Sequence, residues 1–221
     1  MEKNPNPITV EHLTDKEKLI VIHKELSDGF QYIHNYDRSV TFFGSARFKS
    51  DNIYYQKAER VAGRVAKELP NYVVVTGGGP GIMEAANKGA FEAGGKSIGF
   101  SIELPHEQHD NKYLTGKLDF NFFFSRKTIM SFAAEAYIFF PGGFGTLDEL
   151  FEVITLVQTG KIEKVPIVLV GVEYWKHLDE LIKDQLLNQN KTIEPEDTQI
   201  YTITDDEDKI FEIIKNAPVR T

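Results

Sequence analysis

The sequence predicts an α/β protein of the Rossmann-like type, a three-layer αβα sandwich on a mostly parallel sheet, and two observations carry this prediction. Apolar runs of strand length alternate with helical patterns along most of the chain. Two glycine-rich turns, over 76–81 and 141–146, each follow an apolar run and precede a helical pattern. Strands of a parallel sheet read as continuous apolar runs, because helices cover both faces of the sheet.

The chain is expected to divide into an N-terminal extension, residues 1–36, and a single nucleotide-binding domain, residues 37–221. Between about residues 14 and 36, apolar residues recur at spacings of three and four. This spacing gives one amphipathic helix outside the sheet. The remaining length is ordinary for one α/β domain with a sizeable core.

Within the domain, strands and helices should alternate in chain order. The expected strands are 40–43, 72–75, 97–102, 118–124, 137–140 and 167–170, and the expected helices are 54–69, 81–93, 126–134, 146–159 and 174–187. The aromatic run Phe122 to Phe124 falls in the fourth strand and is expected in the core. Two polar connections, 103–116 and 188–198, exceed the usual loop length. The first is the candidate lid over a site at the carboxyl ends of the strands, where ligands bind in such sheets.

Composition limits the class of partner. The chain carries 33 acidic and 25 basic residues, a formal net charge of −8, which argues against binding nucleic acid or an anionic membrane. It has no cysteine, which excludes a thiol nucleophile and fits a reducing compartment. No run approaches the roughly 18–20 apolar residues of a membrane span, and no apolar leader opens the chain. We therefore expect a cytoplasmic protein whose partner is a small molecule.

The glycine-rich turns indicate a phosphate site. The unpaired backbone N–H groups of a first helical turn, together with the helix dipole, attract an anion. Neither turn supplies the Lys-Ser/Thr pair of a P-loop, and neither fits the dinucleotide fingerprint. The remaining interpretation is a nucleoside monophosphate or sugar phosphate held by backbone amides, with help from the hydroxyls of Ser45, Thr76 or Thr146.

Two groups of charged residues allow both a structural and a functional interpretation. Thr146 and Glu149 have the spacing of a capping box, in which the carboxylate only satisfies backbone donors. A carboxylate beside a phosphate site could instead stabilise an oxocarbenium ion as an N-glycosidic bond breaks. Arg126 and Lys127 are either solvated surface charges or cations that hold a phosphate, with Arg126 also orienting Glu149.

The segments 77–87, 104–108, 125–127 and 141–149 together resemble the LOG family, the cytokinin riboside 5′-monophosphate phosphoribohydrolases once labelled lysine decarboxylase-like. The resemblance runs from about Val40 to Val170, and its joint pattern is PGGxGTxxE preceded by an Arg-Lys pair. It implies a homodimer that hydrolyses a nucleoside 5′-monophosphate to free base and ribose 5-phosphate, without metal or organic cofactor. AMP and an N6-substituted AMP are equally compatible substrates.

The same resemblance assigns the site residues. It implies that Arg126 and Glu149 are catalytic, and that the substrate and its phosphate are bound by Ser45, Gly78, Gly79, Met83, Glu84, Lys127, Gly142, Gly143, Gly145 and Thr146. Two other functions stay open, because a fold does not establish a function. One is a carrier that binds a nucleotide or cofactor without catalysis, and the other is a nucleosidase acting on many nucleotides.

Overall fold

The computed structural model describes residues 12–102 and 110–219. In this part of the chain, seven parallel strands form one sheet in the order β4-β3-β2-β1-β5-β6-β7. The strands are β1 (Arg38–Phe43), β2 (Tyr72–Thr76), β3 (Lys96–Ile102), β4 (Gly116–Phe120), β5 (Ala136–Phe139), β6 (Ile167–Leu169) and β7 (Tyr201–Ile203). The α/β class and the parallel sheet predicted from the sequence are thus confirmed.

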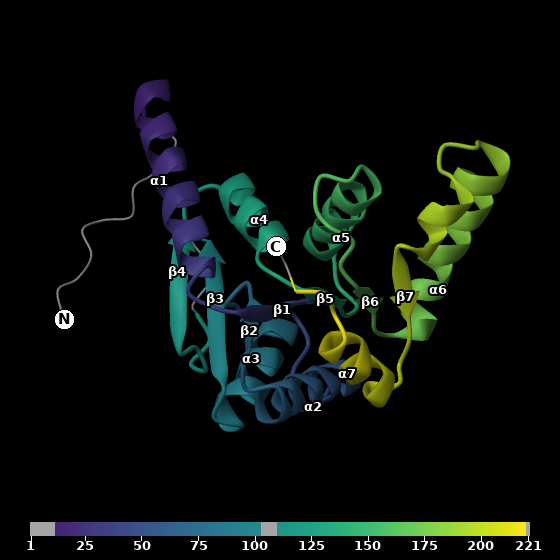
Figure 1. The fold of residues 1–221 in the computed structure, drawn as a ribbon, viewed down its shortest axis with the longest axis horizontal. Helices are drawn as coiled ribbons and strands as arrows, with labels where there is room; N and C mark the ends of the chain where they lie inside the picture. The colour runs from purple at the N-terminus through teal and green to yellow at the C-terminus, as the bar shows by residue number, and fades with distance from the viewer. Residues whose placement is uncertain (1–11, 103–109, 220–221) are drawn as a thin grey trace.

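Helices cover both faces of the sheet (Figure 1). They are α1 (Asp15–Ile33), α2 (Ile53–Glu68), α3 (Ile82–Glu92), α4 (Phe123–Phe132), α5 (Phe144–Gln158), α6 (Val172–Leu181) and α7 (Glu207–Lys215). Side chains of α2, α3 and α7 pack in one apolar core with one face of the sheet. Side chains of α1, α4, α5 and α6 pack in a second core on the other face. The three layers follow from this burial of apolar surface on both sides.

Local signals explain where several helices begin. Thr14 and Glu17 form a capping box ahead of α1, Asn52 accepts a hydrogen bond from the N–H of Tyr54 ahead of α2, and Asp206 caps α7. Each of these side chains satisfies a backbone donor that the first helical turn leaves unpaired.

The strand order reverses beside β1. From β1 the chain adds β2, β3 and β4 on one side, then returns to place β5, β6 and β7 on the other. The crevice outside the carboxyl ends of the strands at such a reversal is where ligands bind in open α/β sheets. Gly44 follows β1 and Pro141 follows β5 closely, so the second glycine-rich turn lies at this reversal.

The structure corrects two expectations. The fourth strand ends at Phe120, and α4 begins at Phe123, so the aromatic run belongs to a helix start and leaves Phe123 and Phe124 exposed. A short apolar run does not distinguish strand from helix. The last unit, β7 and α7, was not expected from the sequence, because β7 has three residues and follows a polar segment. That segment contains a π-helix, residues 182–189, and a 3₁₀ helix, residues 195–199.

None of the helices within the described ranges combines the length and the apolar composition needed to cross a membrane.

Candidate active site

A cleft of about 830 Å³ lies at the carboxyl ends of β1 and β5. It is lined by Gly44, Ser45, Ala46, Arg47, Phe48, Tyr54, Met83, Arg126, Pro141, Gly142, Gly143, Phe144, Gly145, Thr146, Glu149 and Tyr174. A second cavity of about 410 Å³ lies between α1, α4 and the segment before β6, and it contains neither glycine-rich turn. The first cleft is therefore the candidate active site.

Backbone hydrogen bonds join three turns around this cleft. The N–H of Ser45 donates to the carbonyl of Pro141 at 3.0 Å, and the carbonyl of Ser45 accepts from the N–H of Ile82 at 3.0 Å. Gly81 has φ +72°, and a Cβ there would lie 2.2 Å from the carbonyl oxygen of Ser45. Glycine is required at Gly81 for both reasons, and it allows α3 to begin against the turn that follows β1.

The turn that follows β5 has the geometry of an anion site. Gly143 is the N-cap of α5, and no side chain caps the helix. A Cβ on Gly143 or on Gly145 would meet no atom within 4 Å, whereas a Cβ on Gly142 would lie 2.1 Å from Oγ1 of Thr146. The turn is thus closely packed on one side and open on the other. The free N–H groups and the dipole of a 15-residue helix make this open side favourable for a phosphate.

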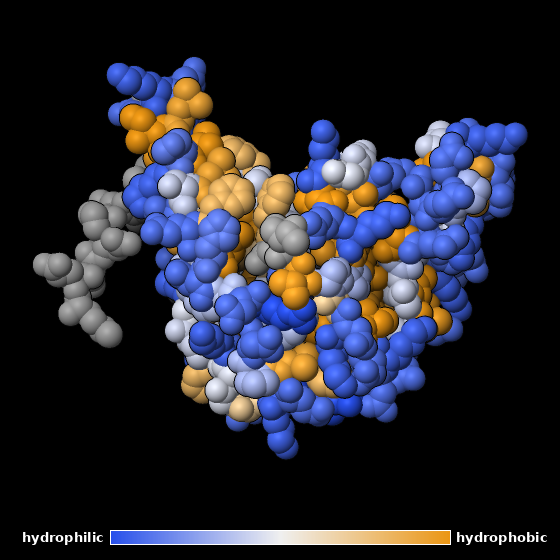
Figure 2. Space-filling model, viewed as in Figure 1, coloured by the Kyte–Doolittle hydropathy of each residue, from blue (hydrophilic) through white to orange (hydrophobic). Residues whose placement is uncertain are grey.

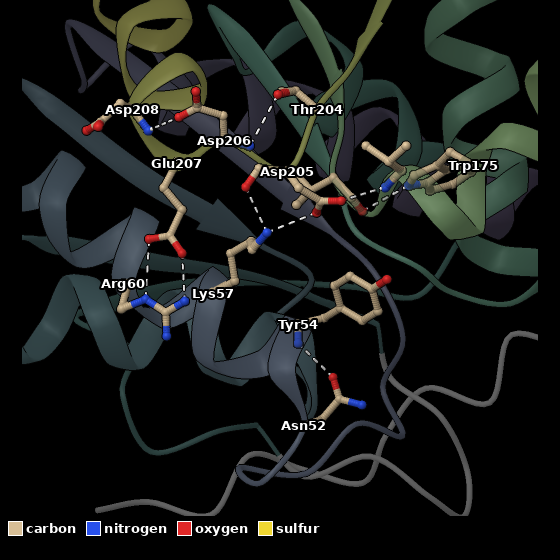
Figure 3. Close-up of polar contacts among 12 residues, drawn as sticks. Asn52, Tyr54, Lys57, Arg60, Trp175, Thr204, Asp205, Asp206, Glu207 and Asp208 are labelled. Atoms are coloured by element: carbon tan, nitrogen blue, oxygen red, sulfur yellow. Dashed lines mark hydrogen bonds and ion pairs between the residues drawn. The ribbon is translucent and has the colours of Figure 1, made fainter.

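Helix α6 and Asp205, which follows β7, hold the turn 141–146 in place. The hydroxyl of Tyr174 donates to the carbonyl of Gly142 at 2.6 Å. The carboxylate of Asp205 accepts from the N–H of Val172, the first residue of α6, at 2.9 Å. Lys57 of α2 donates to the same carboxylate at 2.9 Å, and Figure 3 shows Lys57 reaching across to Asp205 with Tyr54 on the same helix. Burial raises the pKa of Asp205, but these hydrogen bonds and Lys57 outweigh it and lower the pKa.

Arg126 lies buried beneath the cleft. Its Nε donates to the carbonyl of Phe100 at 2.7 Å. A Cβ on Gly77 would lie 2.1 Å from Nη2 of Arg126, so the guanidinium passes directly over the backbone of the first glycine-rich turn. Burial lowers the pKa of Arg126, and Glu149 opposes this by favouring the charged form. A buried guanidinium that stays charged is suited to holding an anionic or polar ligand.

Glu149 is not part of a capping box. The helix α5 begins at Phe144 after the N-cap Gly143, so Thr146 is its third residue and Glu149 its sixth. The structural alternative for this carboxylate, which needs Thr146 at the N-cap and Glu149 three residues later, is therefore wrong. The side chain of Glu149 lines the cleft instead.

Burial raises the pKa of Glu149 to about 7, although Arg126 opposes the rise. The side chains of Arg126 and Glu149 line the same cleft. Within the described part of the chain, no direct ion pair joins them. A carboxyl group with its pKa near neutrality, facing a cleft beside a cation, is typical of a catalytic group.

The structure brings eight of the twelve expected site residues into the cleft lining: Ser45, Met83, Arg126, Gly142, Gly143, Gly145, Thr146 and Glu149. Their roles there stay predictions. The other four, Gly78, Gly79, Glu84 and Lys127, lie outside the lining.

Gly78 and Gly79 form a structural turn beside the cleft. The N–H of Gly78 is already bonded to Oγ1 of Thr76 at 2.9 Å. The side-chain amide of Asn111 donates to the carbonyls of Gly78 and Gly79 at 3.0 and 3.1 Å, and to Asn87 at 2.9 Å. A buried, satisfied network of this kind fixes the backbone of the turn, and the binding roles of Gly78 and Gly79 stay predictions. Residues 103–109 of the expected lid lie outside the described residues.

Glu84 and Lys127 have other partners. Glu84 accepts a hydrogen bond from the hydroxyl of Tyr55 at 2.9 Å. Lys127 pairs with Asp148 at 2.8 Å and with Glu152 at 2.9 Å. Lys127 follows Arg126 directly on α4, and adjacent helical residues point in different directions, so only Arg126 reaches the cleft.

Three functional candidates were not expected from the sequence: Gly77, Arg47 and Tyr174. The side chain of Arg47 is exposed in the cleft lining, and its N–H donates to Oγ of Ser45 at 3.1 Å. The turn Gly44 to Arg47 after the first strand was the available signal for Arg47. Nothing local could have indicated Tyr174, because its role depends on packing against a distant turn. No cluster of metal-ligating side chains occurs in residues 12–102 and 110–219.

Comparison with known proteins gives a family match and named relatives. The model of a family described as "possible lysine decarboxylase" matches residues 83–214. A cytokinin riboside 5′-monophosphate phosphoribohydrolase of Rhodococcoides fascians is 30% identical over 145 residues, which cover 64% of this chain and 72% of the relative. A probable enzyme of the same name from Arabidopsis thaliana is 33% identical over 150 residues, covering 62% and 73%.

Solved structures share the fold. The molybdenum cofactor carrier protein of Chlamydomonas reinhardtii superposes with a TM-score of 0.61 over 82% of this chain and 98% of that chain. Its sequence identity is 19%, so this likeness concerns the architecture alone.

Proposed function

This chain belongs to the possible lysine decarboxylase family, which the LOG-type relatives share, and from that premise we propose that it hydrolyses the N-glycosidic bond of a nucleoside 5′-monophosphate. The proposed products are the free base and ribose 5-phosphate. The cytokinin-type substrate printed in the relatives' names belongs to those proteins, and for this chain AMP and N6-substituted AMP are the candidates.

One observation carries the proposal: Glu149 and Arg126 line the cleft that also contains the open start of α5. The helix start is suited to the 5′-phosphate. Glu149 has a pKa of about 7 because it is buried, so a large part of the carboxyl population is ionised at neutral pH. The 5′-phosphate lies away from the N-glycosidic bond. The binding energy that it contributes can offset the cost of orienting the substrate at that bond.

In the proposed reaction, the C1′–N bond breaks and its electron pair leaves with the base. Positive charge develops on C1′ and the ring oxygen, and the ionised carboxylate of Glu149 stabilises it. A water oxygen then bonds to C1′. One proton of that water passes to Glu149 and from there to the departing base nitrogen, so one water is consumed and the enzyme is regenerated. Arg126 anchors the substrate beside Glu149.

Decarboxylation fits the cleft poorly, despite the family's description. Amino acid decarboxylation with pyridoxal phosphate uses a lysine that forms a Schiff base. Among the residues found to line the cleft, none is a lysine, and the neighbouring Lys127 is engaged by Asp148 and Glu152.

A carrier function is the second candidate, favoured by the shared fold with the molybdenum cofactor carrier. A carrier needs the phosphate site but gains nothing from a carboxyl group whose pKa lies near neutrality. We favour the hydrolase because Glu149 and Arg126 line the same cleft as the open start of α5. A nucleosidase with broad substrate range uses the same chemistry and differs only in base recognition.

We also propose a homodimer. Five phenylalanines of α4 and α5 are exposed: Phe123, Phe124, Phe132, Phe144 and Phe151. Figure 2 shows apolar side chains gathered on the hollowed side of the molecule between α1 and α6. Exposed apolar patches of this kind mark interaction surfaces. Sedimentation equilibrium should give twice the chain mass of 25.1 kDa, and a single-chain mass would contradict the dimer.

The deciding experiment is a substrate panel with the full chain. AMP, N6-substituted AMP, other purine and pyrimidine monophosphates and NAD are incubated with the protein, and free base is measured by chromatography. Release of base that is abolished by Glu149→Gln supports the hydrolase. Tight nucleotide binding without base release favours the carrier, and release from every member favours the broad nucleosidase.

A further inference from the structure

The N-terminal helix α1 contacts both segments that hold Arg126. In Figure 1, α1 stands beside α4 at the β3–β4 side of the sheet. A Cβ on Gly29 of α1 would lie 2.4 Å from a side-chain atom of Ile129 on α4. Phe30 meets Phe132 edge-on, with ring centroids 5.8 Å apart. The close approach of the two helices therefore depends on a small residue at the crossing.

A buried carboxylate on α1 holds the chain just before α4. Glu25 is 7% exposed. Its Oε1 accepts from the backbone N–H of Asn121 at 2.6 Å and from the side-chain amide of Asn121 at 3.1 Å. Its Oε2 is buried and has no hydrogen-bond partner within the described ranges. Burying a carboxylate with one oxygen that lacks a hydrogen bond costs free energy. Solvation or packing on the surface therefore does not explain why Glu25 lies at this position.

The hydrogen bonds from Asn121 to Glu25 affect the part of α4 that carries Arg126. Asn121 precedes Phe122, the N-cap of α4, and the N–H of Arg126 donates to the carbonyl of Phe122 at 3.2 Å. The hydrogen bonds to Glu25 thus fix the residue next to the turn of α4 from which the Arg126 side chain emerges.

The other support of Arg126 also meets α1. The carbonyl of Phe100 on β3 accepts from Nε of Arg126. The ring of Tyr32 on α1 packs edge-on against the ring of Phe100, with centroids 6.0 Å apart. A single helix outside the sheet therefore contacts the start of α4 and the strand residue that binds the guanidinium.

We propose that α1 is a positioning element for the active site, and that Glu25, acting through Asn121, is the positioning residue that sets the place of the Arg126 guanidinium in the cleft. Glu25 does not touch the substrate. Its effect on turnover rests on the proposed hydrolase, whereas its effect on Arg126 does not.

The test replaces Glu25 in the full chain and follows Glu149, whose titration senses Arg126. The charged side chains that act on Glu149 are Arg126 and Lys127 of α4 and Asp148 and Glu152 of α5. Of the two cations, Arg126 has the larger effect on Glu149, and Lys127 makes two ion pairs with α5, so a change at the start of α4 acts on Glu149 mainly through Arg126. Carboxyl carbon NMR of the ligand-free protein measures the titration.

Glu25→Ala should raise the pKa of Glu149 above that of the wild type, because Arg126 retreats, and should lower kcat by about ten-fold to a hundred-fold, as misplacement of an aligned group by about 1 Å does. Glu25→Gln keeps an acceptor for Asn121 and should restore both values. Lys24→Ala, at an exposed neighbour on α1, is the matched control and should change neither.

An unchanged Glu149 titration and kcat in folded Glu25→Ala would overturn the proposal, as would Glu25→Gln behaving like Glu25→Ala. Should Glu25→Ala fail to fold, Glu25→Asp keeps the charge but withdraws the acceptor by one methylene, and it should shift the titration of Glu149 in the same direction. If the wild type releases no base from any nucleotide, the proposed hydrolase fails, while the NMR comparison still decides the role of Glu25.

Discussion

Nη2 of Arg126 lies where a side chain at Gly77 would begin, since a Cβ on Gly77 would stand 2.1 Å from it. Gly77 is not among the described glycines with positive φ, so alanine fits the backbone but not the space above it. Gly77→Ala should push the guanidinium aside and lower kcat about a hundred-fold, with little change in the melting temperature. Steady-state kinetics and thermal unfolding measure the two effects.

A double-mutant cycle provides the control for Gly77. If Gly77→Ala acts through Arg126, then the double variant Gly77→Ala with Arg126→Ala should be no slower than Arg126→Ala alone. Additive losses would mean that Gly77 matters for another reason, such as the shape of its own turn.

Glu149→Gln should stabilise the protein at alkaline pH. The folded-state pKa of Glu149, about 7, lies above the ordinary value of 4.5, so the folded state binds this proton more tightly than the unfolded chain. The stability that the protonated group contributes is complete below about pH 4.5 and is lost as pH rises through 7. The gain in free energy of unfolding should be near zero at pH 4 and up to about 3 kcal/mol at pH 8.

Thermal unfolding of the two proteins at both pH values measures this difference, at about 2–4 °C per kcal/mol for a chain of this size. Glu212→Gln, at an exposed position on α7, is the control and should show no such pH dependence. Equal melting temperatures of Glu149→Gln and wild type at pH 8 would contradict a raised pKa.

The rate of hydrolysis should depend on the ionised form of Glu149. Because burial raises the pKa of Glu149 to about 7, kcat should rise with pH through this value and level off above it. The substrate phosphate titrates near pH 6, so kcat, which reports the bound complex, is the quantity to follow. A residual rate in Glu149→Gln should lack this dependence, and a kcat that falls as pH rises through 7 would instead make Glu149 a general acid.

The sequence predicts the cleft better than the parts that shape it. The turn 141–146 and its position after a strand follow from glycines and apolar runs, and the resemblance to the LOG family implies the choice of Arg126 and Glu149. The choice between a capping box and a cleft carboxylate at Glu149 could not be made, because it depends on whether α5 begins at Gly143 or at Thr146. Both residue types are acceptable N-caps.

Arg126 and Lys127 show a second limit. They are adjacent, and both are cations at the start of a helix, yet one is buried beneath the cleft and the other pairs with α5. Which of two neighbours faces a site depends on the rotation of the helix about its axis. That rotation is set by tertiary packing, including the contacts of α1, and no local pattern encodes it.

Arg47→Ala should weaken substrate binding. Arg47 is exposed in the cleft lining. Ser45, in the same turn as Arg47, is hydrogen-bonded to Pro141 of the turn 141–146, which we call the phosphate turn. Loss of a charge-assisted contact to phosphate costs about 1.5–3 kcal/mol, so KM for a nucleoside monophosphate should rise roughly ten-fold to a hundred-fold, with a smaller effect on kcat. The rise of KM with added salt should also become shallower.

Lys49→Ala is the matched control for Arg47, since Lys49 lies two residues later in the same exposed loop and outside the cleft lining. It should leave KM unchanged. The same increase in KM in both variants would indicate a general charge effect of the loop rather than a phosphate contact by Arg47.

Tyr174→Phe should loosen the phosphate turn. The hydroxyl of Tyr174 donates to the carbonyl of Gly142 at 2.6 Å, and its removal leaves the ring in place but frees the turn. Loss of one neutral hydrogen bond costs about 0.5–1.5 kcal/mol, so kcat/KM should fall by about two-fold to ten-fold.

The matched control is Tyr201→Phe, whose hydroxyl donates to Asp179 at 2.9 Å away from the cleft lining. Tyr201→Phe should lower the melting temperature by a similar amount without changing kcat/KM, because its bond joins β7 to the last turn of α6, whereas Tyr174 lies in the first turn of α6 and bonds to Gly142 directly. Equal losses of kcat/KM in the two variants would mean that Tyr174 acts only through overall stability, and the link from α6 to the phosphate turn would then have no part in substrate binding.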